Sequence, residues 1–504
     1  MPNISISIVD KQPALSAASI LAVPVYEKAD IAAALAPAVV TSLRKQFENL
    51  GFTGQWADSC TVIAPPSLKA SFIAGLGLGA PNASGAREAE GMRRAIGRVL
   101  QEARRHGVRE LSVAIPDAEH APLLAAAVVE SAELSDYRFV EHRKALRKEQ
   151  QQRSLKKLTI IVAKQHLKAA QTEAKQAQAV MKGVTLARQL VDQPASHASP
   201  TSLVEAAEKI ADSNQQIEIT VFDKNEAARR GFNAFLAVAR GSVQDPYVIH
   251  LTYRPKEEAK HHIALVGKGV TFDSGGLSLK PSQYMTDMKV DMAGAATVLG
   301  IFSVIEKMKL PVEVHGIIAA CENMPSGDAY RPGDVVAAMN GKTIEIQNTD
   351  AEGRVTLADA LSYAIKQPVD AVIDLATLTG ACVVALGDNY AGLWSNSAAL
   401  RKQLLDGAKQ SGEGAVGMPL PEEYRQFIQS KVADVTNSPS NPMGSAITAA
   451  LFLQEFVGKK PWAHFDIAGP AYISKPILPY YTPGATGYGV RMLISYLQSL
   501  ANQE

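Results

Sequence analysis

Along residues 1–165, apolar and polar positions alternate between two patterns, one typical of strands and the other of helices. Short apolar runs bounded by proline, glycine or polar residues predict strands, and longer runs with helical spacing predict helices. We expect strands at Ser5–Val9, Ile20–Val25, Thr61–Ala64, Ala70–Leu76, Glu110–Ile115 and Lys157–Ala163, and helices at Ala86–His106 and Pro122–Ser131. Because the two kinds of element alternate, this segment is predicted to be a small N-terminal α/β domain of βαβ units with a mostly parallel sheet.

A glycine-rich stretch, Gly75-Leu-Gly77-Leu-Gly79, closes the fourth of these strands. The backbone amides of such a stretch can bind phosphate at the start of a helix. The spacing does not match a full dinucleotide-binding fingerprint, so we expect a tight loop here rather than a phosphate site.

Residues 166–195 have long helical periodicity with few helix-breaking residues, and they are predicted to form a helical linker between two domains. Residues 196–504 are expected to form a second, larger domain, in which strand-like and helical runs alternate again. Its strands are expected at Ile217–Phe222, Tyr247–Tyr253, His262–Gly267, Val312–Ala320, Ala371–Leu375 and Ala463–Ile467, and its main helices at Asp287–Met308, Val355–Lys366 and Gly487–Leu500. Asn340-Gly341 predicts a two-residue hairpin turn. The fold class is therefore α/β, with a mixed sheet flanked by helices in the second domain.

The chain has 504 residues, 47% of them hydrophobic, with 51 Lys and Arg against 50 Asp and Glu. This length and apolar fraction suffice for two domains with large cores. The near-neutral total hides an asymmetry, because residues 1–180 carry a net charge of +6 (23 basic, 17 acidic) and the remainder −5 (28 basic, 33 acidic). Three widely spaced cysteines are no disulfide framework, and neither a signal peptide nor a membrane span is expected. We therefore expect a cytoplasmic protein whose acidic residues collect in the second domain.

Three polar segments stand where the pattern predicts the ends of buried strands or the starts of helices. In the first, Lys268 and Asp273 follow the apolar strand His262–Gly267 within a glycine-rich stretch, and Lys280 comes shortly after them. Sites in open α/β sheets gather at the carboxyl ends of strands, where glycines allow tight turns and close approach to a ligand. Lys268 and Asp273 are therefore expected to project from a constrained loop.

The second segment places Asp287 and Asp291 one helical turn apart at the start of a long apolar helix. Carboxylates in a first turn also complement the helix dipole, and this explanation is preferred for Asp287. Asp291 lies among apolar neighbours, where an unpaired carboxylate would be strongly destabilising, so it is expected to have a cation partner.

The third segment, Asn348-Thr-Asp-Ala-Glu-Gly-Arg354, places Asp350, Glu352 and Arg354 at alternate positions, on one side if the backbone is extended. Taken alone, this segment could equally be a salt-bridged loop. Taken together, the three segments supply four carboxylates and no histidine, which is an oxygen-rich site suited to Mg²⁺, Mn²⁺ or Zn²⁺. Four acids fit two divalent ions that share carboxylates, and Lys268 could act as a neutral amine ligand beside them.

The sequence lacks the motifs of other hydrolase classes. No His-Glu-x-x-His occurs among the ten histidines, and the sequence has neither a Gly-x-Ser-x-Gly elbow nor a Gly-x-x-x-x-Gly-Lys-Ser/Thr phosphate loop. A two-metal hydrolase of another bond, such as a phosphoester, is an alternative, although Lys268 as a ligand and an apolar pocket would argue against it.

The stretch Asn348–Arg354 resembles the signature of the leucine (cytosol) aminopeptidase family. Four further stretches resemble the other active-site blocks of that family: Val266–Gly276, Lys280, the helix with Asp291, and Ile373–Gly380. The resemblance covers about residues 180–500, whereas residues 1–165 resemble the N-terminal α/β domain of the family only in layout. It implies a leucyl-type aminopeptidase that releases neutral N-terminal residues from peptides by attack of a water that two metal ions activate.

The resemblance also assigns roles to single residues. It implies that two Mn²⁺ or Zn²⁺ ions are held by Lys268, Asp273, Asp291, Asp350 and Glu352, with Asp273 and Glu352 bridging. It implies that Lys280 stabilises the oxyanion and that Arg354 holds a bicarbonate that acts as general base. The pocket for the first side chain is implied at Met288, Thr377, Gly380 and Ala468, of which Met288 and Ala468 could equally be core residues.

Two expectations concern partners. The resemblance implies peptide substrates and a homohexamer, and no membrane. Some bacterial relatives also bind DNA, so the basic N-terminal domain and its run Arg143–Lys157 make an accessory DNA-binding role the alternative function. A solvated helix face is the preferred explanation of that run.

Overall fold

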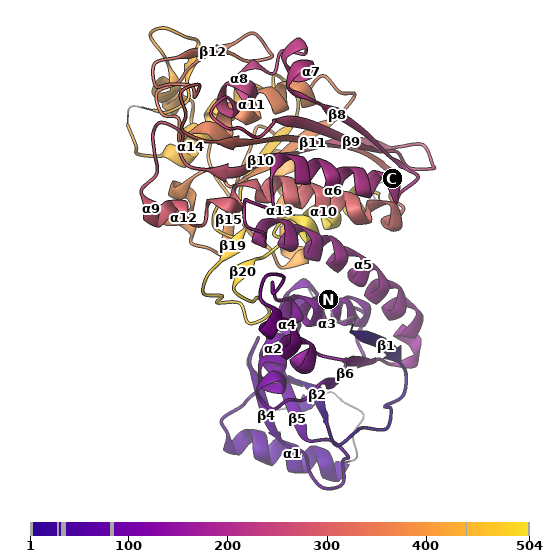
Figure 1. The fold of residues 1–504 in the computed structure, drawn as a ribbon. Helices are drawn as coiled ribbons and strands as arrows, with labels where there is room; N and C mark the ends of the chain where they lie inside the picture. The colour runs from indigo at the N-terminus through magenta and orange to yellow at the C-terminus, as the bar shows by residue number, and fades with distance from the viewer. Residues whose placement is uncertain (1–3, 28–29, 32–36, 81–84, 440, 502–504) are drawn as a thin grey trace. The chain divides into compact units, whose positions relative to one another are not determined.

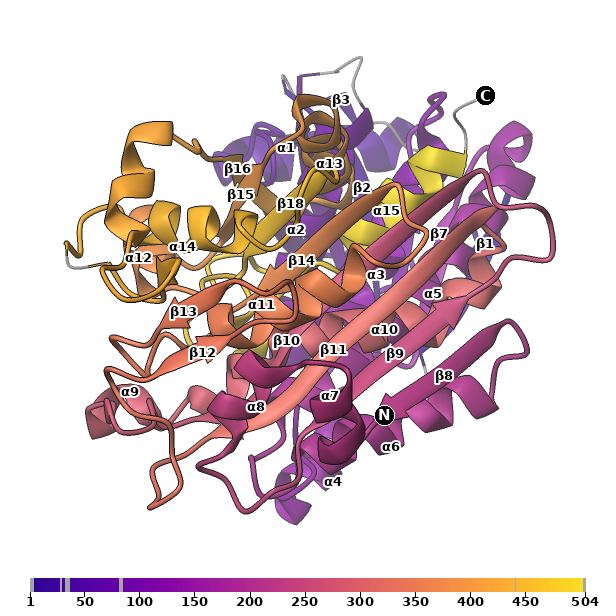
Figure 2. The same ribbon diagram turned by 90° about the horizontal axis from the view of Figure 1, so that it is seen from above.

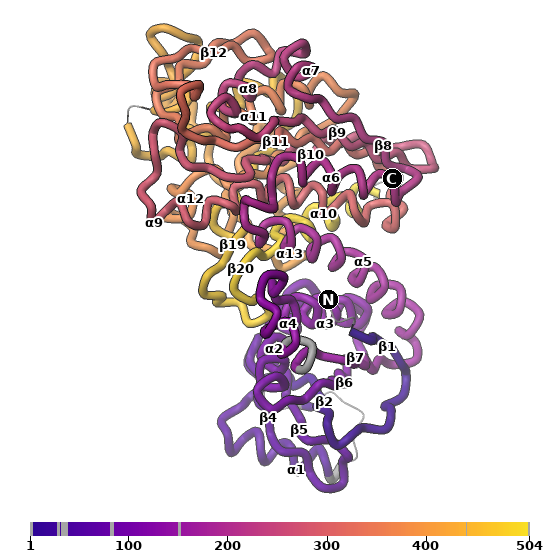
Figure 3. Tube along the Cα trace, viewed as in Figure 1, coloured from indigo at the N-terminus to yellow at the C-terminus, as the bar shows by residue number. Residues whose placement is uncertain are grey.

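The computed structural model describes residues 4–27, 30–31, 37–80, 85–439 and 441–501, and the chain can be followed in Figures 1 and 3. It divides into two compact units. Unit 1 comprises Met1–Met181 and Ser474–Pro483, and unit 2 comprises Lys182–Ile473 and Gly484–Glu504. The division falls within helix α5 (Leu167–Asp192), which confirms the long helix expected at these residues.

Unit 1 is built on a seven-stranded sheet in the order β1-β7-β6-β2-β5-β4, with β3 paired to β2. The neighbours from β1 to β5 in this order run parallel, whereas β3 and β4 run antiparallel to their partners. The strands are β1 (Ser5–Val9), β2 (Ser19–Tyr26), β3 (Asp30–Ile31), β4 (Ser59–Ile63), β5 (Phe72–Gly79), β6 (Glu110–Ala114) and β7 (Lys157–Ile161), and the helices are α1 (Pro37–Asn49), α2 (Gly85–Arg105), α3 (Ala121–Asp136), α4 (Lys144–Arg153) and the 3₁₀ turn η1 (Lys164–His166). The α/β layout predicted for this segment is confirmed.

Strand β2 shows how the core of unit 1 is divided. Ile20 and Ala22 belong to one apolar cluster, and Leu21 and Val23 belong to another. Successive side chains of a strand point to opposite faces, so the sheet is covered by apolar side chains on both sides. The sequence of such a strand is a continuous apolar run, which is typical of parallel sheets.

The glycine-rich stretch forms part of strand β5 and not a loop, so the predicted tight loop is wrong. A Cβ atom at Gly75 would lie 2.6 Å from the ring of Phe52, and one at Gly77 would lie 2.0 Å from the carbonyl oxygen of Gln55. These glycines are therefore required because neighbouring segments pack directly on the strand.

Unit 2 contains an eight-stranded sheet in the order β16-β15-β18-β14-β10-β11-β9-β8. Its four central strands, from β18 to β11, run parallel, while β15 and β9 run antiparallel to their central neighbours. The strands are β8 (Ile217–Phe222), β9 (Tyr247–Tyr253), β10 (His261–Asp273), β11 (Val312–Asn323), β14 (Ala371–Ala376), β15 (Tyr390–Ser395), β16 (Gly414–Gly417) and β18 (Trp462–Asp466). The predicted mixed sheet is confirmed, and Figure 2 shows its long strands side by side.

Helices cover both faces of this sheet, with α6 and α10 on one side and α8, α11 and α14 on the other (Figure 1). The helices of unit 2 are α6 (Pro200–Asp212), α7 (Lys224–Arg229), α8 (Asn233–Ala239), α9 (Ser282–Met285), α10 (Ala293–Met308), α11 (Glu352–Ala364), α12 (Gly380–Leu386), α13 (Ala398–Ser411), α14 (Ser445–Gln454) and α15 (Val490–Ala501), with 3₁₀ segments η2 (Met288–Met292) and η3 (Glu422–Ile428). Two small sheets complete the unit: β12 (Val335–Ala337), β13 (Thr343–Glu345) and β17 (Val435–Thr436) form one, and β19 (Tyr472–Ile473) and β20 (Gly484–Ala485) form the other.

The helix expected at Asp287–Met308 is divided into η2 and α10. Gly294 allows the start of α10 to pack closely on Leu375, because a Cβ atom at this position would lie 2.0 Å from the Leu375 carbonyl oxygen. The stretch Met288–Met308 is long and apolar enough to cross a membrane by length and composition, and 83% of an apolar window of 18 residues within it is buried in the structure. Such burial is typical of a core helix that packs on a sheet.

The hairpin predicted around Asn340-Gly341 is present, but its turn is longer than two residues. Strands β12 and β13 pair from Val335–Glu345 to Ala337–Thr343, which leaves five residues between them. Gly341 adopts a φ of 88°, a value that favours glycine.

Candidate active site

The residues singled out from the sequence gather at the carboxyl ends of the central strands of unit 2. Asp273 is the last residue of β10, Asn323 is the last residue of β11 and pairs with it in register, and Thr377 follows β14 directly. Ligands of open α/β sheets bind at this edge. Because β10 pairs with β11 almost throughout its length, Lys268 projects from a strand and not from the loop expected for it.

Lys268 connects two of the acids. Its Nζ lies 2.7 Å from Asp291 Oδ1 and 2.8 Å from Glu352 Oε1, and it donates to the carbonyl oxygen of Thr377 at 3.2 Å. The hydroxyl of Thr377 donates to the same Asp291 oxygen at 2.7 Å. All four residues are buried. Lys268 is thus the cation partner that Asp291 was expected to need, whereas Asp287 is exposed.

Lys280 connects the other two acids. Its Nζ lies 2.8 Å from Asp273 Oδ2 and 2.5 Å from Asp350 Oδ1. Asp273 Oδ1 accepts from the backbone N–H of Gly275 at 2.8 Å. The four carboxylates are therefore paired two by two with the two ammonium groups.

The same acids could hold cations. Asp273, Asp350 and Glu352 each present a carboxylate oxygen, and these three oxygens lie within 4.8 Å of one another. Asp291 Oδ2 is buried and has no hydrogen-bond partner among the residues that the structure describes. A buried carboxylate oxygen without a partner is strongly unfavourable, and oxygen-rich sites of this kind suit divalent ions. The donor set therefore fits metal ions.

The pKa values of the cluster reflect its excess of acidic over basic side chains. Burial raises the pKa of Asp273 to about 7, the charge of Glu352 adds to this, and Lys280 and Lys268 oppose it. Burial likewise raises the pKa of Asp291 well above its usual range. Burial alone would lower the pKa of Lys268, but the carboxylates of Asp291, Glu352 and Asp273 outweigh it and raise that pKa. The cluster thus holds its ammonium groups charged and lacks positive charge overall.

Arg354 lies beside the acids on helix α11. Its Nη1 donates to the carbonyl oxygen of Asn437 at 2.7 Å, and its Nε is buried without a partner among the described residues. Burial lowers the pKa of Arg354 to about 10, against the charges of Glu352 and Asp466. Glu352 and Arg354 stand in the first turn of α11, so the extended backbone considered for this segment is wrong beyond Asp350.

The residues implied for the substrate pocket lie on four different elements. Met288 is the first residue of η2, Gly380 is the first residue of α12, and Ala468 follows β18; the first and last are half-buried, and Gly380 is exposed. Thr377 is buried and hydrogen-bonded to Asp291, as described above.

Three polar side chains at the site were missed from the sequence. Asn323 donates to Asp273 Oδ1 at 2.8 Å, and the Tyr330 hydroxyl donates to the carbonyl oxygen of Thr349 at 2.8 Å. Asn437 Oδ1 accepts from the backbone N–H of Gln347 at 2.9 Å, and its Nδ2 donates to the carbonyl oxygen of Asn348 at 2.7 Å. Asn323 ends an apolar strand, so the strand-end rule could have found it, whereas Tyr330 and Asn437 lie in segments without a pattern.

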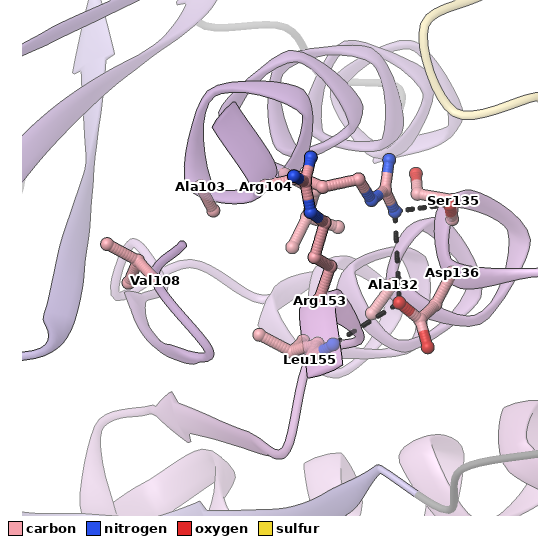
Figure 4. Close-up of a pocket in the computed structure, with 9 residues that line it drawn as sticks. Ala103, Arg104, Val108, Ala132, Ser135, Asp136, Arg153 and Leu155 are labelled. Atoms are coloured by element: carbon pink, nitrogen blue, oxygen red, sulfur yellow. Dashed lines mark hydrogen bonds and ion pairs between the residues drawn. The ribbon is translucent and has the colours of Figure 1, made fainter. Parts of the chain in front are cut away.

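A cavity in unit 1 is too small to compete with this site. It measures about 10 Å³ and is lined by residues from α2, α3 and the segment around α4 (Figure 4). Arg104 donates to the carbonyl oxygen of Ser135 at 2.8 Å, and Asp136 accepts from the backbone N–H of Leu155 at 3.2 Å. A cavity of this volume holds about one water molecule.

Comparison with known proteins identifies the family. Residues 185–494 match the sequence model of the cytosol aminopeptidase family, catalytic domain, and residues 22–145 match that of its N-terminal domain. The chain belongs to the cytosol aminopeptidase family. It is therefore an aminopeptidase, a hydrolase of peptide bonds, and the family predicted from the stretch Asn348–Arg354 is confirmed.

Relatives in this family match most of the chain. A probable cytosol aminopeptidase of Persephonella marina is 48% identical over 383 residues, which are 76% of this chain and 75% of the relative. One of Synechococcus elongatus is 41% identical over 459 residues, 91% of each chain. The bottromycin maturation enzyme BotP, solved in complex with Mn, is 32% identical with a TM-score of 0.82 over 96% of this chain and 100% of that chain.

Proposed function

We propose that this aminopeptidase releases neutral, leucine-like N-terminal residues from peptides and that it uses two divalent metal ions, Mn²⁺ or Zn²⁺. The observation that carries the proposal is the buried acid cluster, in which oxygens of Asp273, Asp350 and Glu352 lie within 4.8 Å of one another beside the unpartnered Asp291 Oδ2. The Mn complex of BotP supports the choice of metal. When bound, two such ions supply Lewis-acid activation of the peptide carbonyl and of the attacking water.

The ligands divide into two sets in this proposal. Lys268, Asp273, Asp291 and Glu352 would hold one ion, and Asp273, Asp350 and Glu352 would hold the other. Lys268 would bind as a neutral amine, because a neighbouring cation disfavours the ammonium form. Metal at Asp273 and Asp350 would take over the carboxylates that Lys280 contacts, which would leave its ammonium group to face the substrate.

Two basic residues complete the chemistry. Lys280 Nζ stabilises the oxyanion that develops on the substrate carbonyl. Arg354, whose Nε has no partner in the described structure, holds bicarbonate as the general base. A separate base is needed because every carboxylate of the cluster is committed to metal in this proposal.

We propose the remaining features on the same basis. Met288, Thr377, Gly380 and Ala468 line the pocket for the first side chain. Residues 1–165 form the N-terminal domain, 166–195 the helical linker and 196–504 the catalytic domain of a cytoplasmic homohexamer that acts on peptides. The relatives are named as probable cytosol aminopeptidases, which supports this location.

An accessory role in DNA binding is the second candidate. The observation that favours it is helix α4, on which Lys144, Arg147, Lys148 and Arg153 are exposed. Arg153 lies 3.4 Å from Glu149, so part of this charge is already paired. Retardation of duplex DNA that weakens steeply with salt and disappears in an Arg147→Ala, Lys148→Ala, Arg153→Ala variant would support this role, and absent or salt-insensitive retardation would exclude it.

The main proposal is tested with a chromogenic leucine amide. Activity should be lost after exhaustive chelation, return with Mn²⁺, and be absent from Asp350→Ala and Glu352→Ala. A phosphomonoester assayed in parallel should stay uncleaved. Activity that survives chelation, or persists in both variants, would refute the two-metal mechanism.

A further inference from the structure

Asn323 occupies a central position between the acids of the site. It is the last residue of β11 and has no exposed surface. Its Nδ2 donates to Asp273 Oδ1 at 2.8 Å and to the carbonyl oxygen of Thr349 at 2.9 Å. Asp273 ends the neighbouring strand, and Thr349 precedes Asp350. One amide group therefore joins the two segments that carry these acids.

The orientation of this amide is determined by its neighbours. Both partners of Nδ2 are acceptors only, since one is a carboxylate oxygen and the other a carbonyl oxygen. A flipped amide would place Oδ1 against both of them, which is repulsive. The donor end of Asn323 must therefore face Asp273 and Thr349.

The other end of the side chain has no partner. Asn323 Oδ1 is buried and accepts no hydrogen bond from the described residues. Burying an unsatisfied acceptor costs about 1–3 kcal/mol. Asn437 shows the contrast, because its amide oxygen and nitrogen both bond to the loop that precedes α11. Fold stability alone therefore does not explain an asparagine at position 323.

The contact orients Asp273. Its Oδ1 is held by Asn323 Nδ2 and the N–H of Gly275, each at 2.8 Å, so Oδ2 is the oxygen left to face the acid cluster. We propose that Asn323 is a positioning residue for the metal ions: it fixes the carboxylate of Asp273 and the loop of Asp350 in one arrangement. This inference rests on the two-metal function proposed above. We assign Asn323 to the site because its Nδ2 bonds to both acid-bearing segments while its buried Oδ1 has no partner among the described residues.

The test measures metal binding directly. Mn²⁺ is titrated calorimetrically into chelator-treated wild-type protein and into Asn323→Leu, which keeps the branched shape of the side chain and removes both donors. Removing such a supporting hydrogen bond is expected to weaken Mn²⁺ binding by roughly 10- to 100-fold. Asn323→Ala, which introduces no bulk, serves as the second variant in case the leucine disturbs folding.

A matched variant separates positioning from general destabilisation. Asp359 on α11 is also fully buried and also joins two segments, because it accepts from the backbone N–H of Phe235 at 2.9 Å and of Met339 at 2.8 Å. It takes no part in the acid cluster. Asp359→Asn should lower the melting temperature and leave the Mn²⁺ dissociation constant unchanged.

The outcomes distinguish this inference from the proposed function. If the Asn323 variants bind Mn²⁺ within about twofold of wild type, the inference is wrong and the proposed function is unaffected, even if the variants melt at a lower temperature. A purely structural role of Asn323 predicts no larger change in the Mn²⁺ dissociation constant. Wild-type protein that neither binds Mn²⁺ nor cleaves the leucine amide overturns both.

Discussion

Gly353, which stands between Glu352 and Arg354, has no room for a side chain. A Cβ atom there would lie 2.5 Å from Lys268 Cε and 2.6 Å from Lys268 Nζ. Gly353→Ala should therefore displace Lys268 from Asp291 and Glu352 and weaken Mn²⁺ binding by roughly tenfold or more. Calorimetric titration measures this, with Gly327→Ala as control because nothing lies within 4 Å of a Cβ at Gly327. Equal affinities in the two variants would contradict the prediction.

Lys280 offers a complementary prediction, because its proposed role concerns the transition state. Lys280→Met keeps the length of the side chain and removes the ammonium group. Loss of one oxyanion donor lowers kcat by about 10²- to 10³-fold, while metal content should stay at the wild-type value. Steady-state kinetics with metal analysis of the same sample check both parts, and a variant that loses its metal would assign Lys280 a different role.

At this scale the sequence was most informative about charged residues. Asp273, Asp291, Asp350 and Glu352 could be selected because a carboxylate near an apolar run needs a partner. Asn437 could not, because a neutral amide in an irregular segment has no such requirement and reaches the loop before α11 from almost ninety residues further along the chain. The roles of the selected residues stay predictions until the variants are measured.

Strands β9 and β11 carry a chain of hydrogen bonds that neutral histidines satisfy. The Tyr363 hydroxyl lies 3.0 Å from His250 Nδ1, His250 Nε2 lies 3.0 Å from His315 Nδ1, and His315 Nε2 lies 3.0 Å from Glu313 Oε1. Glu313 accepts from His315, His315 accepts from His250, and His250 accepts from the Tyr363 hydroxyl. Each imidazole therefore donates once and accepts once, and neither needs a second proton. Protonating His315 would place its Nδ1–H against the Nε2–H of His250, which are two donors.

This chain predicts how stability depends on pH. Burial, together with His315 and Arg254, lowers the pKa of His250 to about 4, while an unfolded histidine titrates near 6.5. As the pH falls from 6.5 to 4, His250 binds a proton in the unfolded chain but not in the folded chain, so this residue should contribute a drop of roughly 3 kcal/mol in the free energy of unfolding. Urea unfolding across this range measures the drop. Between these pH values His250→Gln should lose less stability than wild type, whereas exposed His197→Gln should match wild type, and an equal pH dependence of His250→Gln and wild type would be the contrary result.

Elements were predictable where the pattern was long and regular. The helix within residues 166–195 was found because its periodicity extends over many residues, and the central strands were found because each contains a short, continuous apolar run. The break between η2 and α10 was missed because contacts distant in sequence, such as that of Gly294 with Leu375 beside it, cannot be read from a local pattern. The five-residue turn of the β12–β13 hairpin was missed for a similar reason, since Asn340-Gly341 specifies a tight bend and not where the strand pairing ends.

At the scale of the whole molecule, every proposed metal ligand belongs to unit 2. A ligand stabilises only the part of a protein that binds it, by about 2.7 kcal/mol at a hundredfold excess over its dissociation constant. Calorimetric melting of metal-free protein should therefore show one transition that rises by several degrees with Mn²⁺ and one that does not move. A uniform shift of the whole profile would mean that the two units melt together.

The paired lysines have a consequence for how the enzyme matures. Lys268 and Lys280 contact all four carboxylates, so the catalytic unit carries internal counter-ions for part of their charge. We therefore expect the catalytic unit to fold before it binds metal. Because Lys268 would bind metal as a neutral amine, metal loading should release a proton to the solvent.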